Sequence, residues 1–191
     1  MDDQLLERFI EWSQRNPRNP SVELVPAREL EAAPPLFTHP RGEIAEFYSR
    51  LAFDDYVSSK QGKYFEFNPF AKSLNGSDGW ATFKNRQTKE IELYPEWDFG
   101  ECIFFGTEIQ QGPAFVQLET GVVYGMLPGS WDKYKLAPRF SEFLRAFLEI
   151  ADLKVPSCDE NPEFHKQTTV IAKQIVGEEC WPGFSEFFCV G

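Results

Sequence analysis

Apolar residues recur at helical spacing in the N-terminal part of the chain. In residues 3–15 this pattern is followed by "NPRNP", whose prolines and asparagines end a helix. The apolar positions of this short amphipathic helix are Leu5, Leu6, Phe9 and Ile10. A second helix is predicted for "GEIAEFYSRLAFDDYV", residues 42–57, where one face carries Ile44, Phe47, Tyr48, Leu51 and Ala52. Residues 22–35 predict an irregular connection with one short strand at "VELV".

Beyond Ser58 the pattern changes to short segments rich in aromatic and β-branched residues. These segments are "KYFEFNPF", "WATFKN", "EIELYP", "ECIFFG", "AFVQL" and "VVYGML", with "NGSDG", "NRQTKE" and "ETG" as turns between them. They predict a mainly antiparallel, twisted sheet of about five or six strands between residues 64 and 126. The alternation in "IELY" and "FVQL" predicts one solvent-exposed face and one covered face.

Two further helices and an aromatic tail follow the sheet. Residues 139–153, "RFSEFLRAFLEIADL", carry a broad apolar stripe, and residues 161–177 offer Asn161 as a cap, Pro162 at the first helical position and Gly177 as a stop. The tail "EECWPGFSEFFCVG" is aromatic enough that we expect it to pack on the body or in a groove. We therefore predict one α+β domain over residues 1–191, with a core at about residues 40–150 and a C-terminal helical extension at residues 151–191.

The composition indicates a cytoplasmic protein. No run approaches the ~20 apolar residues of a membrane-spanning helix, and the acidic N-terminus lacks the features of a secretory signal. The four cysteines, Cys102, Cys158, Cys180 and Cys189, are scattered without a C-x-x-C pair and predict reduced thiols. A bridge between Cys180 and Cys189 is the alternative in an oxidising compartment.

The charge of the chain indicates which partners it can bind more clearly than its composition does. The formal net charge is -11, which argues against nucleic acid as a partner because such binding draws its affinity from Lys and Arg. Residues 90–132 contain no Lys or Arg but eight acidic residues. A negative field of this kind attracts a cationic partner.

Signs of catalytic chemistry are sparse. The glycines of the central segment match no phosphate-binding motif and no lysine lies nearby, so they are interpreted as turn residues. Glu96, Asp98 and Glu101 could act as paired carboxylates or hold a hard metal ion, although a solvated acidic face explains the same spacing. Cys158 and His165 could form a nucleophilic pair only if the fold brings them together. Trp80, Trp97 and Trp131 lie beside turn residues, where a tryptophan either anchors a partner or caps the core.

Residues 101–148 resemble the second half of the SUKH superfamily. The shared features are an apolar strand ending in glycine at residues 103–106, a strand at 115–118, a turn and strand at 120–124, and a helix opening "FSEFL" at 140–144. The resemblance implies helices packed on a twisted sheet and no active site. It also implies a role as an immunity protein that binds and neutralises a polymorphic toxin, or as a cytoplasmic regulator.

The charge pattern and the resemblance predict a non-enzymatic protein-binding module, an immunity protein whose partner is a basic toxin. No catalytic residue, metal or cofactor is predicted, and neither nucleic acid nor membrane is an expected partner. The predicted partner-binding residues are Glu96, Trp97, Asp98, Glu101, Glu108, Glu119, Trp131 and Asp132. The alternatives are a regulatory or scaffold protein of the same fold, and a small enzyme or ligand-binding protein that uses the clustered carboxylates.

Overall fold

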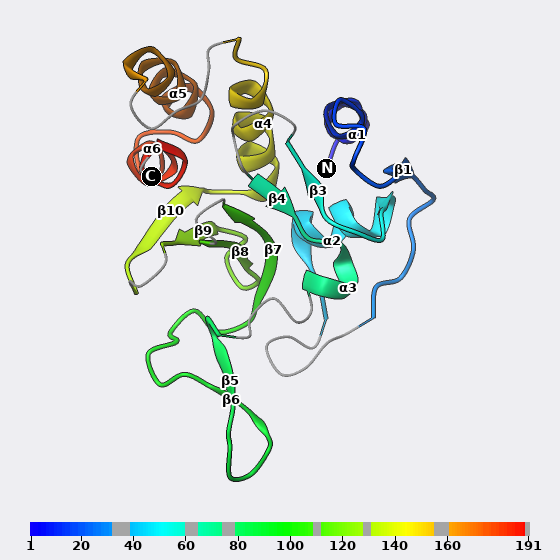
Figure 1. Cartoon of the computed structure of the whole chain (residues 1–191), viewed down its shortest axis with the longest axis vertical. Coiled ribbons are helices and arrows are strands. Elements are labelled where there is room, and N and C mark those ends of the chain that lie inside the picture. The colour runs from blue at the N-terminus through cyan, green and yellow to red at the C-terminus, as the bar shows by residue number, and fades with distance from the viewer. Residues whose placement is uncertain are drawn as a thin grey trace.

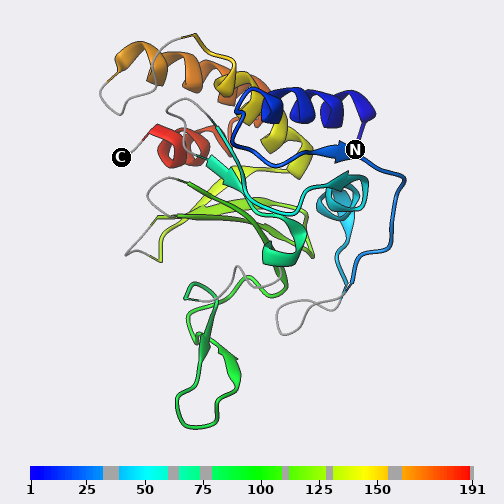
Figure 2. The same cartoon turned by 45° about the vertical axis from the view of Figure 1, so that its right-hand side comes forward.

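The computed structural model describes residues 1–31, 39–59, 65–73, 79–108, 112–127, 131–154 and 161–189. Its main element is a six-stranded antiparallel sheet with strand order β10-β9-β8-β7-β4-β3. The strands of this sheet are β3 (Val57–Ser58), β4 (Phe65–Phe67), β7 (Cys102–Glu108), β8 (Pro113–Gln117), β9 (Val123–Met126) and β10 (Lys133–Ala137). Helices cover one side of it (Figures 1 and 2), so the predicted α+β class and antiparallel sheet are confirmed.

The helices in the described ranges are α1 (Asp3–Gln14), α2 (Gly42–Arg50), α3 (Phe70–Ser73), α4 (Phe140–Ala151), α5 (Pro162–Ile175) and α6 (Trp181–Cys189). Helix α1 begins where the side chain of Asp2 accepts a 2.8 Å hydrogen bond from the backbone N–H of Leu5. Helix α5 begins in the same way, because Asn161 accepts from the N–H groups of Glu163 and Phe164. None of the helices in the described part of the chain is long and apolar enough to cross a membrane.

The second predicted helix ends earlier than its apolar pattern indicates. Helix α2 stops at Arg50, and Leu51 takes an extended conformation because β2 (Leu51–Ala52) pairs with β1 (Glu23–Leu24). Strand β1 is the short strand predicted at "VELV". Val57, the last residue of the predicted helix, begins edge strand β3.

The main core lies between the sheet and the helices and consists largely of phenylalanine rings. Phe9 of α1 contacts Phe47 of α2 and Phe67 of β4 edge to face, with centroid distances of 5.1 and 4.9 Å. Phe147 of α4 closes the same cluster at 5.2 Å from Phe67. Such edge-to-face pairs add to the stabilisation from apolar burial.

The aromatic C-terminal tail forms helix α6 and packs on the sheet, as the sequence predicts. Phe184 and Phe187 have no exposed surface. Two glycines allow α6 to lie close to the sheet. A Cβ at Gly125 of β9 would lie 2.6 Å from the Phe187 ring, and a Cβ at Gly183 of α6 would lie 2.6 Å from the backbone oxygen of Lys135.

Two of the predicted strands do not join the main sheet. Strands β5 (Thr82–Lys84) and β6 (Ile91–Leu93) pair only with each other and form a two-stranded ribbon, called here the arm (residues 79–94). In both Figure 1 and Figure 2 the arm projects from the body on the side away from α1, α4 and α5.

The prediction of a solvent-exposed face is wrong for the central strands β7 and β8. All but one residue in each of these strands is buried, because the segment that returns from the arm folds over the face that the helices leave open. Phe99 from this segment contacts Phe115 of β8 and Tyr124 of β9, at 5.1 and 4.7 Å between centroids. The sheet therefore has a small second core opposite the helices.

Candidate protein-binding surface

Trp97 lies in the second core and not on the surface. Its side chain packs against Phe104 and Phe115, with centroid distances of 5.7 and 5.2 Å, and the residue is only 8% exposed. The indole N–H donates a 3.0 Å hydrogen bond to the carbonyl oxygen of Gly100, which satisfies the one polar atom of the ring. The prediction that Trp97 anchors a partner is therefore wrong: it is a core residue that packs over the central strands β7 and β8.

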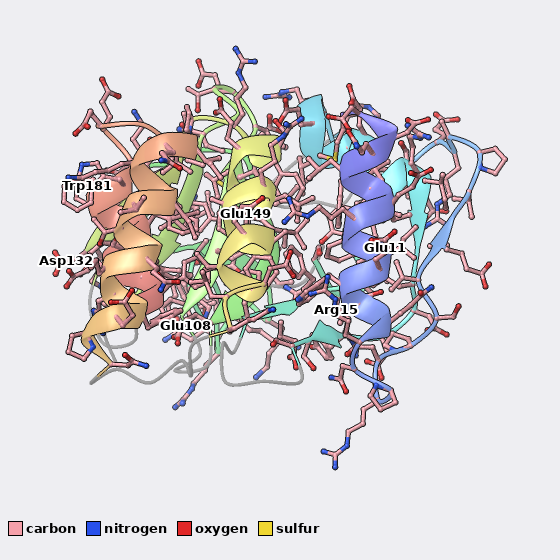
Figure 3. The ribbon with its side chains drawn as sticks, turned by 90° about the horizontal axis from the view of Figure 1, so that it is seen from above. Glu11, Arg15, Glu108, Asp132, Glu149 and Trp181 are labelled. Carbon is pink, nitrogen blue, oxygen red and sulfur yellow. The ribbon has the colours of Figure 1, made fainter. Side chains whose placement is uncertain are left out.

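Glu108 is also unsuited to the surface role predicted for it. It is the last residue of β7, where it pairs with Phe65 of β4 and its N–H donates to the carbonyl oxygen of Gly112. The residue is 8% exposed, so its carboxylate contributes little to the field at the surface. In the view of Figure 3, Asp132 lies at the outer edge of the molecule and Glu108 lies further in, apart from it.

Five of the predicted acids remain at or near the surface and are called here the acidic surface. They are Glu96, Asp98, Glu101, Glu119 and Asp132; Glu101 is half-buried and the other four are exposed. Glu96 and Asp98 come from the segment that returns from the arm, and Glu101 directly precedes β7. The N–H of Leu118 donates a 2.8 Å hydrogen bond to the backbone oxygen of Glu101, so the adjoining Glu119 lies at the same end of the sheet as Glu101.

Two cations from outside the acidic segment reach this surface. Arg41 forms an ion pair with Glu101 at 3.1 Å, and its Nε donates to the carbonyl oxygen of Leu118. Lys133 of β10 pairs with Asp98, and this hydrogen bond and charge lower the pKa of the Asp98 carboxyl. Within the described ranges, Glu96 and Glu119 have no cationic partner.

An aromatic row connects the arm to the acidic surface. The ring of Phe83 in the arm lies 4.8 Å from that of Tyr94 in a tilted arrangement, and Tyr94 in turn forms a T-shaped pair with Trp131 at 5.6 Å between centroids. Trp131 is 43% exposed and precedes Asp132, so it has the accessibility that its predicted anchor role requires.

The sequence pattern did not identify the apolar side of the arm. Ile91 and Leu93 are 56% and 47% exposed, and only Val170, at 49%, has a comparable exposure among the large hydrophobic residues of the described ranges. Their alternation with Glu92 is the pattern of a half-buried strand. Because that pattern is the same whether or not a neighbour covers the apolar side, periodicity alone could not show that this side is open.

The geometry gives little support to the catalytic alternatives. Asp98 and Glu101 are paired with cations from different elements, and no group of three or more His, Cys, Asp and Glu residues in the described parts of the chain could hold a metal ion. Cys158, the predicted partner of His165 of α5, lies outside the described residues. Two open grooves of about 520 and 510 Å³ lie along residues 18–28 and 52–56, and neither is lined by a predicted site residue.

The three other cysteines, Cys102, Cys180 and Cys189, are buried. Cys180 and Cys189 are not bridged to each other. Burial, with a smaller effect from the neighbouring Glu101 charge, raises the pKa of the Cys102 thiol. A buried thiol of raised pKa is a poor nucleophile, so Cys102 is a packing residue.

Comparison with known proteins adds no relative to this description. No family model, no curated protein and no solved structure matches the chain.

Proposed function

We propose that this chain is a non-enzymatic protein-binding module, and specifically a SUKH-type immunity protein that neutralises a basic protein toxin. The observation that carries the proposal is the acidic surface beside exposed Trp131, in a segment of 43 residues, 90–132, without a positive charge. Exposed acids steer a cationic partner into place, and a tryptophan at their edge supplies apolar contact once it arrives.

The proposal assigns different weights to the five acids. Glu96 and Glu119 keep their full charge toward solvent, whereas Asp98 and Glu101 are partly neutralised by Lys133 and Arg41. A basic partner gains most from the first pair, because no cation of the same chain, within its described ranges, has to be displaced to reach it. Reversal of Glu96 and Glu119 is therefore the most sensitive test.

The experiment uses the protein encoded beside this one, produced as a catalytically inactive toxin candidate. Association is measured by stopped-flow fluorescence at several salt concentrations for the wild type and for Glu96→Lys/Glu119→Lys. We expect association of the variant to slow by about tenfold or more at low salt and to become less dependent on salt. Glu11→Lys/Glu29→Lys reverses two exposed acids outside the acidic surface, one of them on the outer helix α1 (Figure 3), and serves as the matched control.

Two results would contradict the proposal. One is an affinity that is unaffected both by salt and by reversal of Glu96 and Glu119. The other is a neighbouring gene product that neither binds nor harms the cell, which would favour the regulatory or scaffold role of the same fold. Trp131→Ala separates the two contributions, since loss of an anchor raises the dissociation rate while steering charges act on the association rate.

A further inference from the structure

The arm is a projecting ribbon that leaves Ile91 and Leu93 exposed on one side, while Thr82 at the base of that side is buried. Two strands of three residues each, β5 and β6, form it, and its register places Ile91 opposite Lys84 and Leu93 opposite Thr82. Phe83, Glu92 and Tyr94 lie on the other side, where the Phe83 and Tyr94 rings contact each other. An isolated two-stranded ribbon is marginally stable in water, and open apolar side chains on such a ribbon mark a contact surface.

The charges of the arm are separated along its length. The tip carries the exposed cations Lys84, Arg86 and Lys89 with one acid, Glu90, in a protein whose net charge is -11. The turn at the tip is ordered by Asn85, whose side chain accepts from the N–H of Gln87 at 2.8 Å and donates to Glu92 at 2.7 Å. The root carries exposed Glu96 and Asp98. The arm is thus positive at its tip and negative at its root.

We infer that the arm is a dimerisation element that docks on the arm of a second copy of this chain. A two-fold axis between the arms sets them antiparallel, so that Ile91 and Leu93 of one copy face the same residues of the other. The same axis places each cationic tip over the acidic root of the other copy. A two-fold contact must be complementary to itself, and a surface with opposite charges at its two ends meets that requirement. The apolar area is small, so the dimer is weak and concentration-dependent.

The test measures the mass of the protein alone, by sedimentation equilibrium across the micromolar range. We expect a monomer–dimer equilibrium in the wild type and a monomer for Ile91→Ser/Leu93→Ser. Tip reversal (Lys84→Glu/Lys89→Glu) and root reversal (Glu96→Lys) should each weaken the dimer by about tenfold or more. Lys166→Glu with Glu11→Lys reverses two exposed charges on helices α5 and α1 and should leave the equilibrium unchanged.

Mixing the two reversed variants gives the sharpest result. A tip-reversed copy and a root-reversed copy again present opposite charges at both ends of the contact, so the mixture should form a heterodimer that is tighter than the homodimer of either variant. This gain of association cannot come from misfolding.

A wild type that stays monomeric at all concentrations would overturn the inference. The tip cations would then be explained as charges that keep the free strand edges from pairing with other chains. A dimer that is indifferent to the arm variants would overturn it equally. No partner protein is present in this measurement, so its outcome is independent of the proposed function.

Discussion

Replacement of Gly125 by alanine tests the docking of the C-terminal helix on the sheet. The new Cβ would lie 2.6 Å from Cδ2 and Cε2 of Phe187 and 3.0 Å from Cδ1 of Leu136, all closer than ordinary van der Waals contact. Phe187 has no exposed surface, and its ring lies 5.3 Å from that of Phe188, so it has little room to move. The methyl group must therefore displace packed atoms.

The expected cost follows from two opposing effects. Overpacking of a buried site costs about 1–3 kcal/mol, while an alanine in place of glycine stabilises by about 0.4–1 kcal/mol because it restricts the unfolded chain. Gly125 does not have a positive φ, so alanine fits its backbone conformation. We expect a net loss of about 1–2 kcal/mol in the free energy of unfolding, or a fall of about 2–8 °C in Tm for a domain of this size.

A double-mutant cycle with Phe187→Leu assigns this loss to one contact. The smaller leucine makes room for the methyl group, so the double variant should be more stable than the sum of the single effects predicts, by about 1 kcal/mol. Urea denaturation followed by circular dichroism gives the four free energies. Gly121→Ala is the control, since Gly121 has φ 76° and nothing within 4 Å of a Cβ, and its strain should add to Phe187→Leu without coupling. A neutral Gly125→Ala variant, or strict additivity with Phe187→Leu, would refute the docking described for α6.

Two further predictions concern polar contacts. Tyr48→Phe removes a buried hydroxyl that donates to the backbone oxygen of Asn68 at 2.8 Å and lies 2.7 Å from Oγ of Ser73. Its loss should lower the free energy of unfolding, measured by urea denaturation, by about 1–3 kcal/mol. The same change at exposed Tyr56 should alter this free energy by no more than about 0.5 kcal/mol. Burial alone would raise the pKa of Asp152, but hydrogen bonds and charges from Arg15 and Arg8 outweigh it and lower the pKa. Its contribution to stability is therefore present above the unfolded-state pKa and is lost as the pH falls through the folded-state pKa. Asp152→Asn should destabilise at neutral pH and match the wild type in acid, while exposed Asp54→Asn should show no such convergence; equal destabilisation by Asp152→Asn at both pH values would contradict the assignment.

The elements that the sequence predicted well are those with local signals at both ends. Helix α5 has its cap at Asn161, proline at its first position and Gly177 at φ 79° just beyond its last turn. These signals act through the backbone within a few residues, so no knowledge of the rest of the fold is needed.

Strand pairing was harder to predict because it depends on distant segments. Strand β10 was missed, although its sequence "KYKLA" alternates in the manner of an edge strand, with Lys133 and Lys135 paired to Asp98 and Glu179. The opposite error occurred for β5 and β6, which have good strand patterns but pair only with each other. A strand pattern in the sequence predicts that a segment pairs with another strand, but it does not identify which strand that is.

The charge of the acidic surface, like strand pairing, depends on distant segments and could not be predicted from one stretch of sequence. A run without Lys or Arg describes neighbours along the chain, but an electrostatic field sums over neighbours in space, and there Arg41 and Lys133 approach from either side of the run. Burial acts in the same direction, since Glu108 belongs to the run yet is only 8% exposed. The field of the folded protein is therefore weaker than the run implies, although Glu96 and Glu119 keep no cationic partner in the described ranges. Glu119 follows the Gln117 end of β8, whereas Trp131 precedes β10 at the opposite end of the sheet. A partner that recognises this surface must match charges and an aromatic ring that are separated in space, which is a more specific demand than a general attraction to basic proteins.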